Sequence, residues 1–215
     1  MLKRGTEQIL HTYCEKSPAA TKIESSLQAC IQLLCDCFEQ GGQLLVCGNG
    51  GSCADADHIV GELVKAFKLK RPLEEPLAQA LQEQGSEGVL LAEHLQSGLP
   101  AINLGAHMSL VTAVVNDMGG EYIYAQQVAA YGRAGDILLG ISTSGNSEDI
   151  LHAGIAAKAK GMKTIGLTGK SGGRMETLFD LILHADSTVT EDIQDQHSTI
   201  YHAICACVEY QCWGD

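Results

Sequence analysis

The sequence has few basic residues and no long apolar run, and both absences limit what the protein does. Its 215 residues include 14 Lys and Arg against 26 Asp and Glu, a formal net charge of −12. This charge argues against a nucleic-acid backbone or an anionic membrane as the main partner. It is still compatible with a phosphorylated small molecule, since such a ligand needs only a local anion site.

No run of 18 apolar residues occurs, so we expect no membrane span. The first ten residues carry charges but no apolar core of signal-peptide length, and we therefore expect a cytoplasmic protein. The nine cysteines are odd in number and contain no C-x-x-C pair. We interpret them as small, reduced core residues rather than as disulfides or a thiolate metal site.

Two nucleotide-binding motifs are also absent. The turn GNGG at residues 48–51 lacks the third glycine of the dinucleotide fingerprint at the required spacing. The stretch TGKSGG at residues 168–173 only superficially resembles a P-loop, because G-x-x-x-x-G-K does not occur.

The segment 44–63 is the centre of the predicted organisation. Its first four residues form an apolar run of buried-strand length, the glycine turn follows, and Ser52 is a suitable N-cap for the helix behind it. Strand, turn and helix make the first half of a βαβ unit, whose turn offers N–H groups to an anion. His58 and Glu62 share one helix face, where they suit a divalent metal such as zinc or form a solvated surface pair.

The rest of the chain alternates between strand and helix patterns. Helices are expected at 6–15 and 22–40, and later strand and helix patterns fall at 100–104, 108–115, 122–131, 137–141, 148–160, 163–167, 181–185 and 193–212. This order predicts a parallel sheet covered on both faces, with ligands at the strand C-terminal ends. We interpret residues 1–215 as one domain, with an N-terminal helical segment of about 5–41 and an insertion of about 73–98.

Two segments have open roles. The insertion is longer than usual connections and serves as a lid, an interface or a solvated excursion. The apolar face of the N-terminal helices packs either within the chain or on another subunit.

The loop Ser142–Ser147 lies between a buried strand and a helix N-terminus. It contains four hydroxyl side chains, a glycine and an asparagine. Hydroxyls, backbone N–H groups and the helix dipole together surround a phosphate without a lysine. Capping preferences account for one or two such hydroxyls but not for four, so we predict an anion site here.

These motifs together resemble the SIS (sugar isomerase) domain, and most closely the phosphoheptose isomerases. The resemblance rests on CGNGGS at 47–52, the His58 and Glu62 pair, Asn-Asp at 116–117, LLGISTSGNS at 138–147, the GMK and LTGK-GG motifs at 161–173 and IQ-x-x-H-x-x-x-x-H at 193–202. It covers about residues 22–212 except the insertion. It implies an α/β fold, a three-layer αβα sandwich with a five-stranded parallel Rossmann-like sheet, and a homotetramer.

The family implies an aldose–ketose isomerase that converts sedoheptulose 7-phosphate to a manno-heptose 7-phosphate. It places metal ligands, usually for zinc, at His58, Glu62, Gln194 and His202. Glu62 and His202 are our predicted acid–base pair for an enediol-type step. The substrate contacts we assign are Asn49, Gly50, Gly51, Ser52, Glu62, Asn116, Asp117, Ser142, Thr143, Ser144, Ser147 and Gln194.

Some features depart from the family pattern. A basic residue four positions after the metal-site glutamate is replaced by Ala66, and an acidic position before the glutamine is Glu191 rather than Asp. Gln194 and His202 are eight residues apart, about 12 Å of rise in a helix. They share one ion only if Gln194 lies in an irregular helix entry or if different subunits contribute.

Three alternatives to this function are open. Related SIS tetramers bind a protein partner, such as a replication initiator, without catalysis, but tend to lose the glutamate at the position of Glu62. A sugar-phosphate-binding regulator would keep the hydroxyl loop and not need the metal ligands. An isomerase for another ketose phosphate is the third.

Overall fold

The protein is an α/β sandwich built on one parallel five-stranded sheet, described here for all 215 residues from a computed structural model. Strand order is β2-β1-β3-β4-β5, and every neighbouring pair is parallel. The strands are β1 (Leu44–Gly48), β2 (Ala101–Asn103), β3 (Ile137–Ser142), β4 (Lys163–Thr168) and β5 (Leu181–His184). The expected three-layer αβα fold is confirmed.

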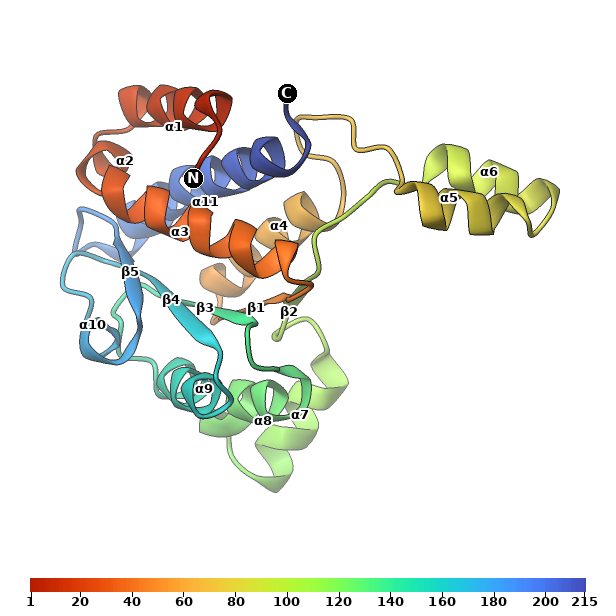
Figure 1. The fold of residues 1–215 in the computed structure, drawn as a ribbon. Coiled ribbons are helices and arrows are strands. Elements are labelled where there is room, and N and C mark those ends of the chain that lie inside the picture. The colour runs from red at the N-terminus through yellow and green to blue at the C-terminus, as the bar shows by residue number, and fades with distance from the viewer.

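Helices cover both faces of the sheet (Figure 1). The helices on one face are α1 (Arg4–Lys16), α2 (Pro18–Lys22), α3 (Glu24–Glu39), α4 (Gly51–Val64) and α11 (Thr190–Trp213). The other face carries α7 (Met108–Asp117), the short 3₁₀ helix η1 (Gly120–Tyr122), α8 (Ile123–Tyr131), α9 (Glu148–Ala159) and α10 (Met175–Leu178). The sequence patterns missed α2 and α10, which are too short to show a helical period.

The two faces of the sheet make two hydrophobic cores. Along β1, Leu44 and Val46 point into the core beneath α3, α4 and α11, while Leu45 and Cys47 point into the core beneath α8 and α9. This alternation follows from the two-residue period of a strand. All five β1 residues are buried, as a central parallel strand requires.

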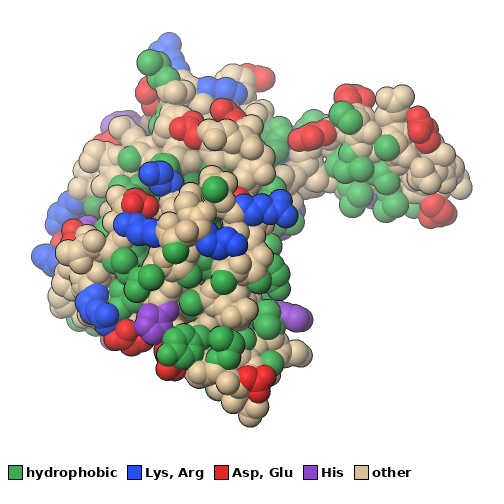
Figure 2. Space-filling view, turned by 60° about the horizontal axis from the view of Figure 1, so that its bottom comes forward, with side chains coloured by type: hydrophobic (Ala, Val, Ile, Leu, Met, Phe, Trp, Pro, Cys, Tyr) green, Lys and Arg blue, Asp and Glu red, His purple; other side chains and the backbone are tan.

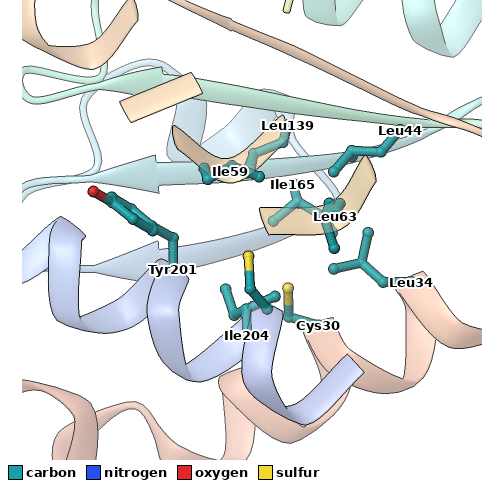
Figure 3. A pocket seen from close by; sticks show the side chains of 10 residues that line it. Cys30, Leu34, Leu44, Ile59, Leu63, Leu139, Ile165, Tyr201 and Ile204 are labelled. Carbon is teal, nitrogen blue, oxygen red and sulfur yellow. The ribbon is translucent and has the colours of Figure 1, made fainter. Parts of the chain in front are cut away.

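The core beneath α3, α4 and α11 contains a small cavity (Figure 3). Its volume is about 10 Å³, and ten hydrophobic residues, including Cys30, Ile59 and Tyr201, line it. A space of this size holds at most one water, and an apolar one stays dry. The substrate site therefore lies outside the core.

Helices α5 (Glu75–Gln82) and α6 (Ser86–His94) project from the body as a separate arm (Figure 1). We call residues 73–98 the arm. Hydrophobic side chains gather on one of its faces (Figure 2). The arm occupies the stretch interpreted as an insertion.

No helix has the length and apolarity needed to cross a lipid bilayer. All nine cysteines are free, and seven of them are buried. This agrees with their interpretation as small core residues.

Candidate functional site

The site is built at the C-terminal edge of the sheet, where β1 and β3 end side by side. Gly48 pairs with Ile141, and Ser142 follows in register beside Thr168 of β4. The glycine turn after β1 and the hydroxyl loop after β3 therefore leave the sheet as neighbours. This is the edge at which parallel sheets bind ligands.

The N-cap of α4 lies in the glycine turn, two residues before the predicted N-cap. Gly50, not Ser52, is the N-cap residue, and its φ of 56° favours glycine. Ser52 lies inside the first turn, 4% exposed, against Gly48. The prediction of Ser52 as the cap was wrong because the glycine conformation ends the turn earlier than side-chain preference suggests.

Asn49 is held in place by two elements that the sequence did not connect to it. Its Nδ2 donates to both carboxylate oxygens of Asp149 at 3.0 and 2.8 Å. The Tyr124 hydroxyl lies 3.1 Å from Asn49 Oδ1 and donates to the Gly48 carbonyl oxygen at 2.6 Å. Burial raises the pKa of Tyr124, so the hydroxyl keeps its proton and its donor role.

The hydroxyl loop brings three serine side chains together at the start of α9. Ser142 Oγ lies 2.9 Å from Ser147 Oγ and 3.5 Å from Ser144 Oγ. Ser147 is the N-cap residue of α9, but its side chain makes no capping bond. Its hydroxyl is therefore available to a ligand at the positive end of the helix. Thr143 carries the fourth hydroxyl, and its carbonyl accepts from the Gly169 amide at 3.0 Å.

Gly145 fixes the shape of this loop. Its φ is 66°, and an added Cβ would lie 1.9 Å from the Gly172 carbonyl oxygen. The loop thus packs directly on the glycine-rich stretch after β4. That stretch supports the hydroxyl loop, which explains its glycines without a nucleotide.

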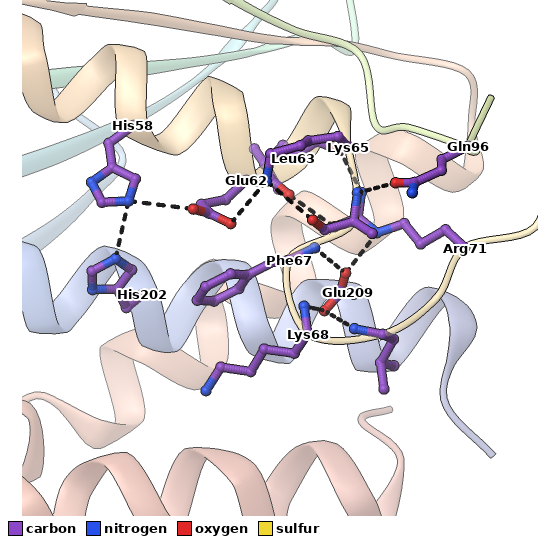
Figure 4. A network of polar contacts seen from close by, with 12 residues as sticks. His58, Glu62, Leu63, Lys65, Phe67, Lys68, Arg71, Gln96, His202 and Glu209 are labelled. Atoms are coloured by element: carbon purple, nitrogen blue, oxygen red, sulfur yellow. Dashed lines mark hydrogen bonds and ion pairs between the residues drawn. The ribbon is translucent and has the colours of Figure 1, made fainter. Parts of the chain in front are cut away.

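A second group of site residues lies between α4 and α11 (Figure 4). His58 Nε2 is 3.3 Å from Glu62 Oε1 and 3.4 Å from His202 Nε2. The Tyr201 hydroxyl lies 3.1 Å from His58 Nδ1, which leaves Nε2 of His58 directed at the other two side chains. The His202 ring also stacks on Phe67 at a centroid distance of 5.8 Å.

Two carboxylate oxygens near this group are buried without a hydrogen-bond partner. They belong to Glu62 and Asp55, the latter one turn before His58 on α4. Burial raises the pKa of Asp55. Burial also lowers the pKa of His202, and the neighbouring His58 lowers it further. Glu62 Oε2 lies 3.9 Å from Lys65 Nζ, beyond hydrogen-bond distance. A neutral imidazole beside a carboxylate with a free oxygen is a suitable pair for moving protons.

The donor types match a zinc site, but one chain does not complete it. His58, His202 and Glu62 supply two imidazole nitrogens and a carboxylate, and Glu62 Oε2 is buried and unsatisfied. No group of three His, Cys, Asp or Glu side chains has the arrangement of a formed metal site. The chemistry of these side chains therefore fits zinc. A bound ion would need one further donor and a local adjustment of the side chains.

Gln194 lies apart from this group. It belongs to the regular part of α11, so an irregular helix entry does not bring it to His202. Its side chain contacts the glycine turn instead, since a Cβ on Gly51 would lie 2.5 Å from Gln194 Nε2. The sequence left two arrangements open, an irregular helix entry or ligands from different subunits. The second, in which Gln194 and His202 of one metal site come from different subunits, stays a prediction.

Asn116 and Asp117 end α7 and are both exposed. The Asn116 amide donates to the Asp117 carboxylate at 2.7 Å. No hydrogen bond joins either residue to the glycine turn or the hydroxyl loop within the chain. Their assignment to the substrate contacts stays a prediction.

His197, which the family pattern contains but to which we assigned no ligand role, is a buried structural residue. It is 0% exposed, and its Nε2 lies 3.1 Å from the Thr168 carbonyl oxygen. Since a carbonyl only accepts, Nε2 carries the proton, and the buried Nδ1 has no partner. Burial lowers the pKa of His197 to about 4.

A fully buried ion pair lies directly behind Glu62, and the sequence patterns missed it. Arg71 Nε is 2.7 Å from Glu209 Oε1, and both residues are 0% exposed. The Arg71 guanidinium also donates to the Glu62 and Leu63 carbonyl oxygens at 2.8 and 2.6 Å. It therefore satisfies two of the carbonyls left free at the C-terminus of α4.

Glu209 completes the same network from α11 (Figure 4). Its carboxylate accepts from the backbone amides of Phe67, Lys68 and Leu69 at 2.8, 2.7 and 3.0 Å. The available sequence signal was an acidic residue inside the apolar stretch of the last helix, next to Val208.

Comparisons with known proteins agree with this arrangement. A sequence profile of the SIS domain matches residues 16–95 and 91–169. The phosphoheptose isomerase of Burkholderia pseudomallei strain 1710b is 40% identical over 200 residues, covering 91% of this chain and 89% of the relative. That of Helicobacter pylori strain P12 is 38% identical over 187 residues, covering 87% and 84%. The solved phosphoheptose isomerase of Neisseria gonorrhoeae superposes with a TM-score of 0.73 at 31% identity, covering 94% of this chain and 97% of that structure.

Replacing Glu209 by leucine should strongly destabilise the fold. It leaves the Arg71 charge and three amides buried without partners, and we expect a loss of about 3–5 kcal/mol in unfolding free energy. Chemical denaturation measures this. The matched control is Glu176→Leu, which removes the half-exposed ion pair with His184 and should cost less than about 1 kcal/mol. Equal losses in both variants would contradict the role of the buried pair.

His197 should make the protein less stable in mild acid. The folded-state pKa of about 4 lies below the ordinary 6.5, so between pH 6.5 and 4 the unfolded state takes up this proton and the folded state does not. The free energy of unfolding should fall between pH 6.5 and 4, by up to roughly 3 kcal/mol from this group. In His197→Gln, whose amide still donates to Thr168, this component should vanish. Parallel pH profiles for the two proteins would show that His197 is not its source.

Proposed function

The chain belongs to the phosphoheptose isomerase family of SIS domain proteins, and from this we propose that it isomerises sedoheptulose 7-phosphate to D-glycero-D-manno-heptose 7-phosphate. The observation that carries the proposal is the 40% identity to a phosphoheptose isomerase over 91% of the chain. It is an aldose–ketose isomerase, and the comparisons favour this over a non-catalytic SIS tetramer. The Glu62 carboxylate supports the same conclusion, since one of its oxygens lies 3.3 Å from His58 Nε2 and the other is buried without a hydrogen-bond partner.

The hydroxyl loop is suited to bind the phosphate. Ser142, Ser144 and Ser147 converge at the N-terminus of α9, where hydroxyl donors and the helix dipole favour an anion. This contact positions the sugar without a lysine or arginine. The backbone amides of the glycine turn, held in place through Asn49, add donors beside it.

The reacting carbons would then lie near Glu62 and His202. Isomerisation removes a proton from C1 of the ketose and returns one to C2, while a proton moves between the two oxygens through an enediol. Glu62, whose Oε2 makes no hydrogen bond and lies 3.9 Å from Lys65 Nζ, is our proposed base at carbon. His202, kept neutral by burial and by His58, is our proposed proton donor and acceptor at oxygen.

We also propose that zinc binds at His58, Glu62 and His202, with Gln194 as a further ligand from the assembled protein. Zinc bound there supplies a positive charge that polarises the substrate oxygens. His58 is oriented for this role by the Tyr201 hydroxyl at its Nδ1.

Identical subunits in a homotetramer are part of the same proposal. Its support is the two-turn separation of Gln194 from His202 on one regular helix, which one chain does not bridge. A cytoplasmic location is also proposed, and the nine free cysteines support a reducing compartment.

Glu62→Gln should abolish proton transfer while leaving the fold intact. The amide is isosteric with the carboxylate but is not a base, so we expect at least a hundredfold loss in rate. NMR in deuterated water, with purified protein, zinc and sedoheptulose 7-phosphate, measures deuterium entry beside the carbonyl and new aldose signals. Glu39→Gln, at an exposed position of α3, is the matched control. Full exchange in the Glu62 variant would remove the base assignment, and no exchange in the wild type would remove the proposed substrate.

Zinc binding should depend on His58 and His202. We expect a chelator-stripped protein to take up one zinc per chain, measured by competition with a zinc indicator. His58→Ala and His202→Ala should each weaken binding at least tenfold, whereas His11→Ala, at an exposed position of α1, should not. Equal affinities in all four proteins would place the metal elsewhere.

A further inference from the structure

Exposed hydrophobic side chains are concentrated in one part of this molecule. Eleven of the fifteen large hydrophobic residues that are exposed lie between residues 64 and 122. Five of them, Leu77, Val89, Leu90, Leu91 and Leu95, belong to the arm and are 41–51% exposed. A contiguous apolar surface of this kind marks an interaction site.

The arm has almost no core of its own. Helix α5 buries no residue, and α6 buries only Gly88. Helices of eight and nine residues are too short to be stable in water by themselves. The arm therefore needs a surface to cover its leucines.

The direction of the arm is nevertheless fixed at its root. The Ser97 amide donates to the Arg71 carbonyl oxygen at 3.3 Å, and the Ser97 hydroxyl donates to the Pro72 carbonyl oxygen at 2.8 Å. Gln96 Oε1 accepts from the Ala66 amide at 2.9 Å. Arg71 itself is anchored by Glu209. The arm is thus presented by the rigid body rather than by a loose loop.

The two helices of the arm are also tightly joined. A Cβ on Gly88 would lie 1.8 Å from the Leu81 carbonyl oxygen, so only glycine permits this approach. The close contact keeps α5 and α6 side by side, and hydrophobic side chains gather on one face of the arm that they form (Figure 2). That face is a preformed binding surface.

The charged side chains of the arm differ in sign from those of the loop that precedes it. The chain has no lysine or arginine from residue 72 to residue 132. The arm contains the exposed glutamates Glu74, Glu75 and Glu93 near its root and Glu83 and Glu87 around its tip. Lys65, Lys68 and Lys70 are exposed on the loop that precedes the root. A groove of about 230 Å³ at the root, lined by Lys70, Leu73 and Leu95 among others, offers space for side chains.

We propose that the arm packs antiparallel against the arm of a second copy of this chain, with leucine face against leucine face and the acidic tip against the lysines of the loop 65–70. A two-fold axis between the arms places each tip on the other root, so one surface complements itself. The inference rests on the proposed assembly of identical subunits and adds the segment that joins two of them. It also brings the tip of one arm to the loop 65–70 of its neighbour, next to Phe67 and His202.

The first test removes the leucine face. Wild type, the double variant Leu90→Ser with Leu91→Ser, and the control Ile155→Ser, at an exposed α9 position, are compared by sedimentation velocity over a hundredfold concentration range. We expect the double variant to dissociate into smaller species at concentrations at least tenfold higher than wild type, and the control to behave as wild type. An assembled wild type with an unchanged double variant overturns the arm contact alone. A monomeric wild type overturns the proposed assembly as well.

The second test reverses charges at opposite ends of the arm. One variant carries Glu83→Lys and Glu87→Lys, and the other carries Lys68→Glu and Lys70→Glu. Each variant alone pairs like charges at both ends and should assemble more weakly than wild type. An equimolar mixture restores opposite charges at both contacts and should assemble as wild type does, as measured by native mass spectrometry. A mixture no stronger than its components overturns the antiparallel arrangement.

Discussion

The buried contact between Arg71 and Glu209 links the parts of the molecule that matter most for function. Arg71 holds the carbonyl groups at the end of α4, immediately behind the side chain of Glu62. Glu209 holds the amides of the following loop and thereby joins α4 to α11, the helix that carries His202. Two charges removed from water are costly unless all their hydrogen bonds are made. Here six amide or guanidinium donors and three acceptor groups meet that requirement in one place, so the distance between the two helices has little freedom.

The site consists of two regions with different chemistry, the edge of the sheet and the space between helices α4 and α11. Hydroxyl and amide donors at the ends of β1 and β3 form a surface for an anion, and these groups have no titratable proton near neutral pH. Imidazole and carboxylate groups between α4 and α11 provide the proton chemistry. The single helix α11 passes both regions, with Gln194 against the glycine turn and His202 two turns further on. A sugar phosphate that spans them is held at one end and exposed to chemistry at the other.

Much of this was accessible from the sequence because local patterns determine it. Apolar runs followed by glycine or serine loops predicted the parallel strands and the edge at which ligands bind, and the four-residue spacing placed His58 and Glu62 on one face. Contacts between distant residues were not accessible in the same way. Nothing near Asn49 indicates Asp149, one hundred positions away, and nothing near Arg71 indicates Glu209. The cap of α4 was misplaced at Ser52 because the positive φ of Gly50 is a property of the folded turn. The separation of Gln194 from His202 was correctly anticipated, since it follows from the rise of a helix.

The root of the arm, which forms a closed neck between the arm and the domain, has a consequence for the evolution of such a chain. Ser97 returns to bond with Arg71 and Pro72, so the chain leaves the domain and re-enters it at nearly the same point. A closed neck separates the length of the inserted segment from the geometry of everything else. Residues can be gained or lost beyond it without displacing β2 or the end of α4. One inserted recognition element can therefore replace another during evolution while the catalytic domain stays unaltered.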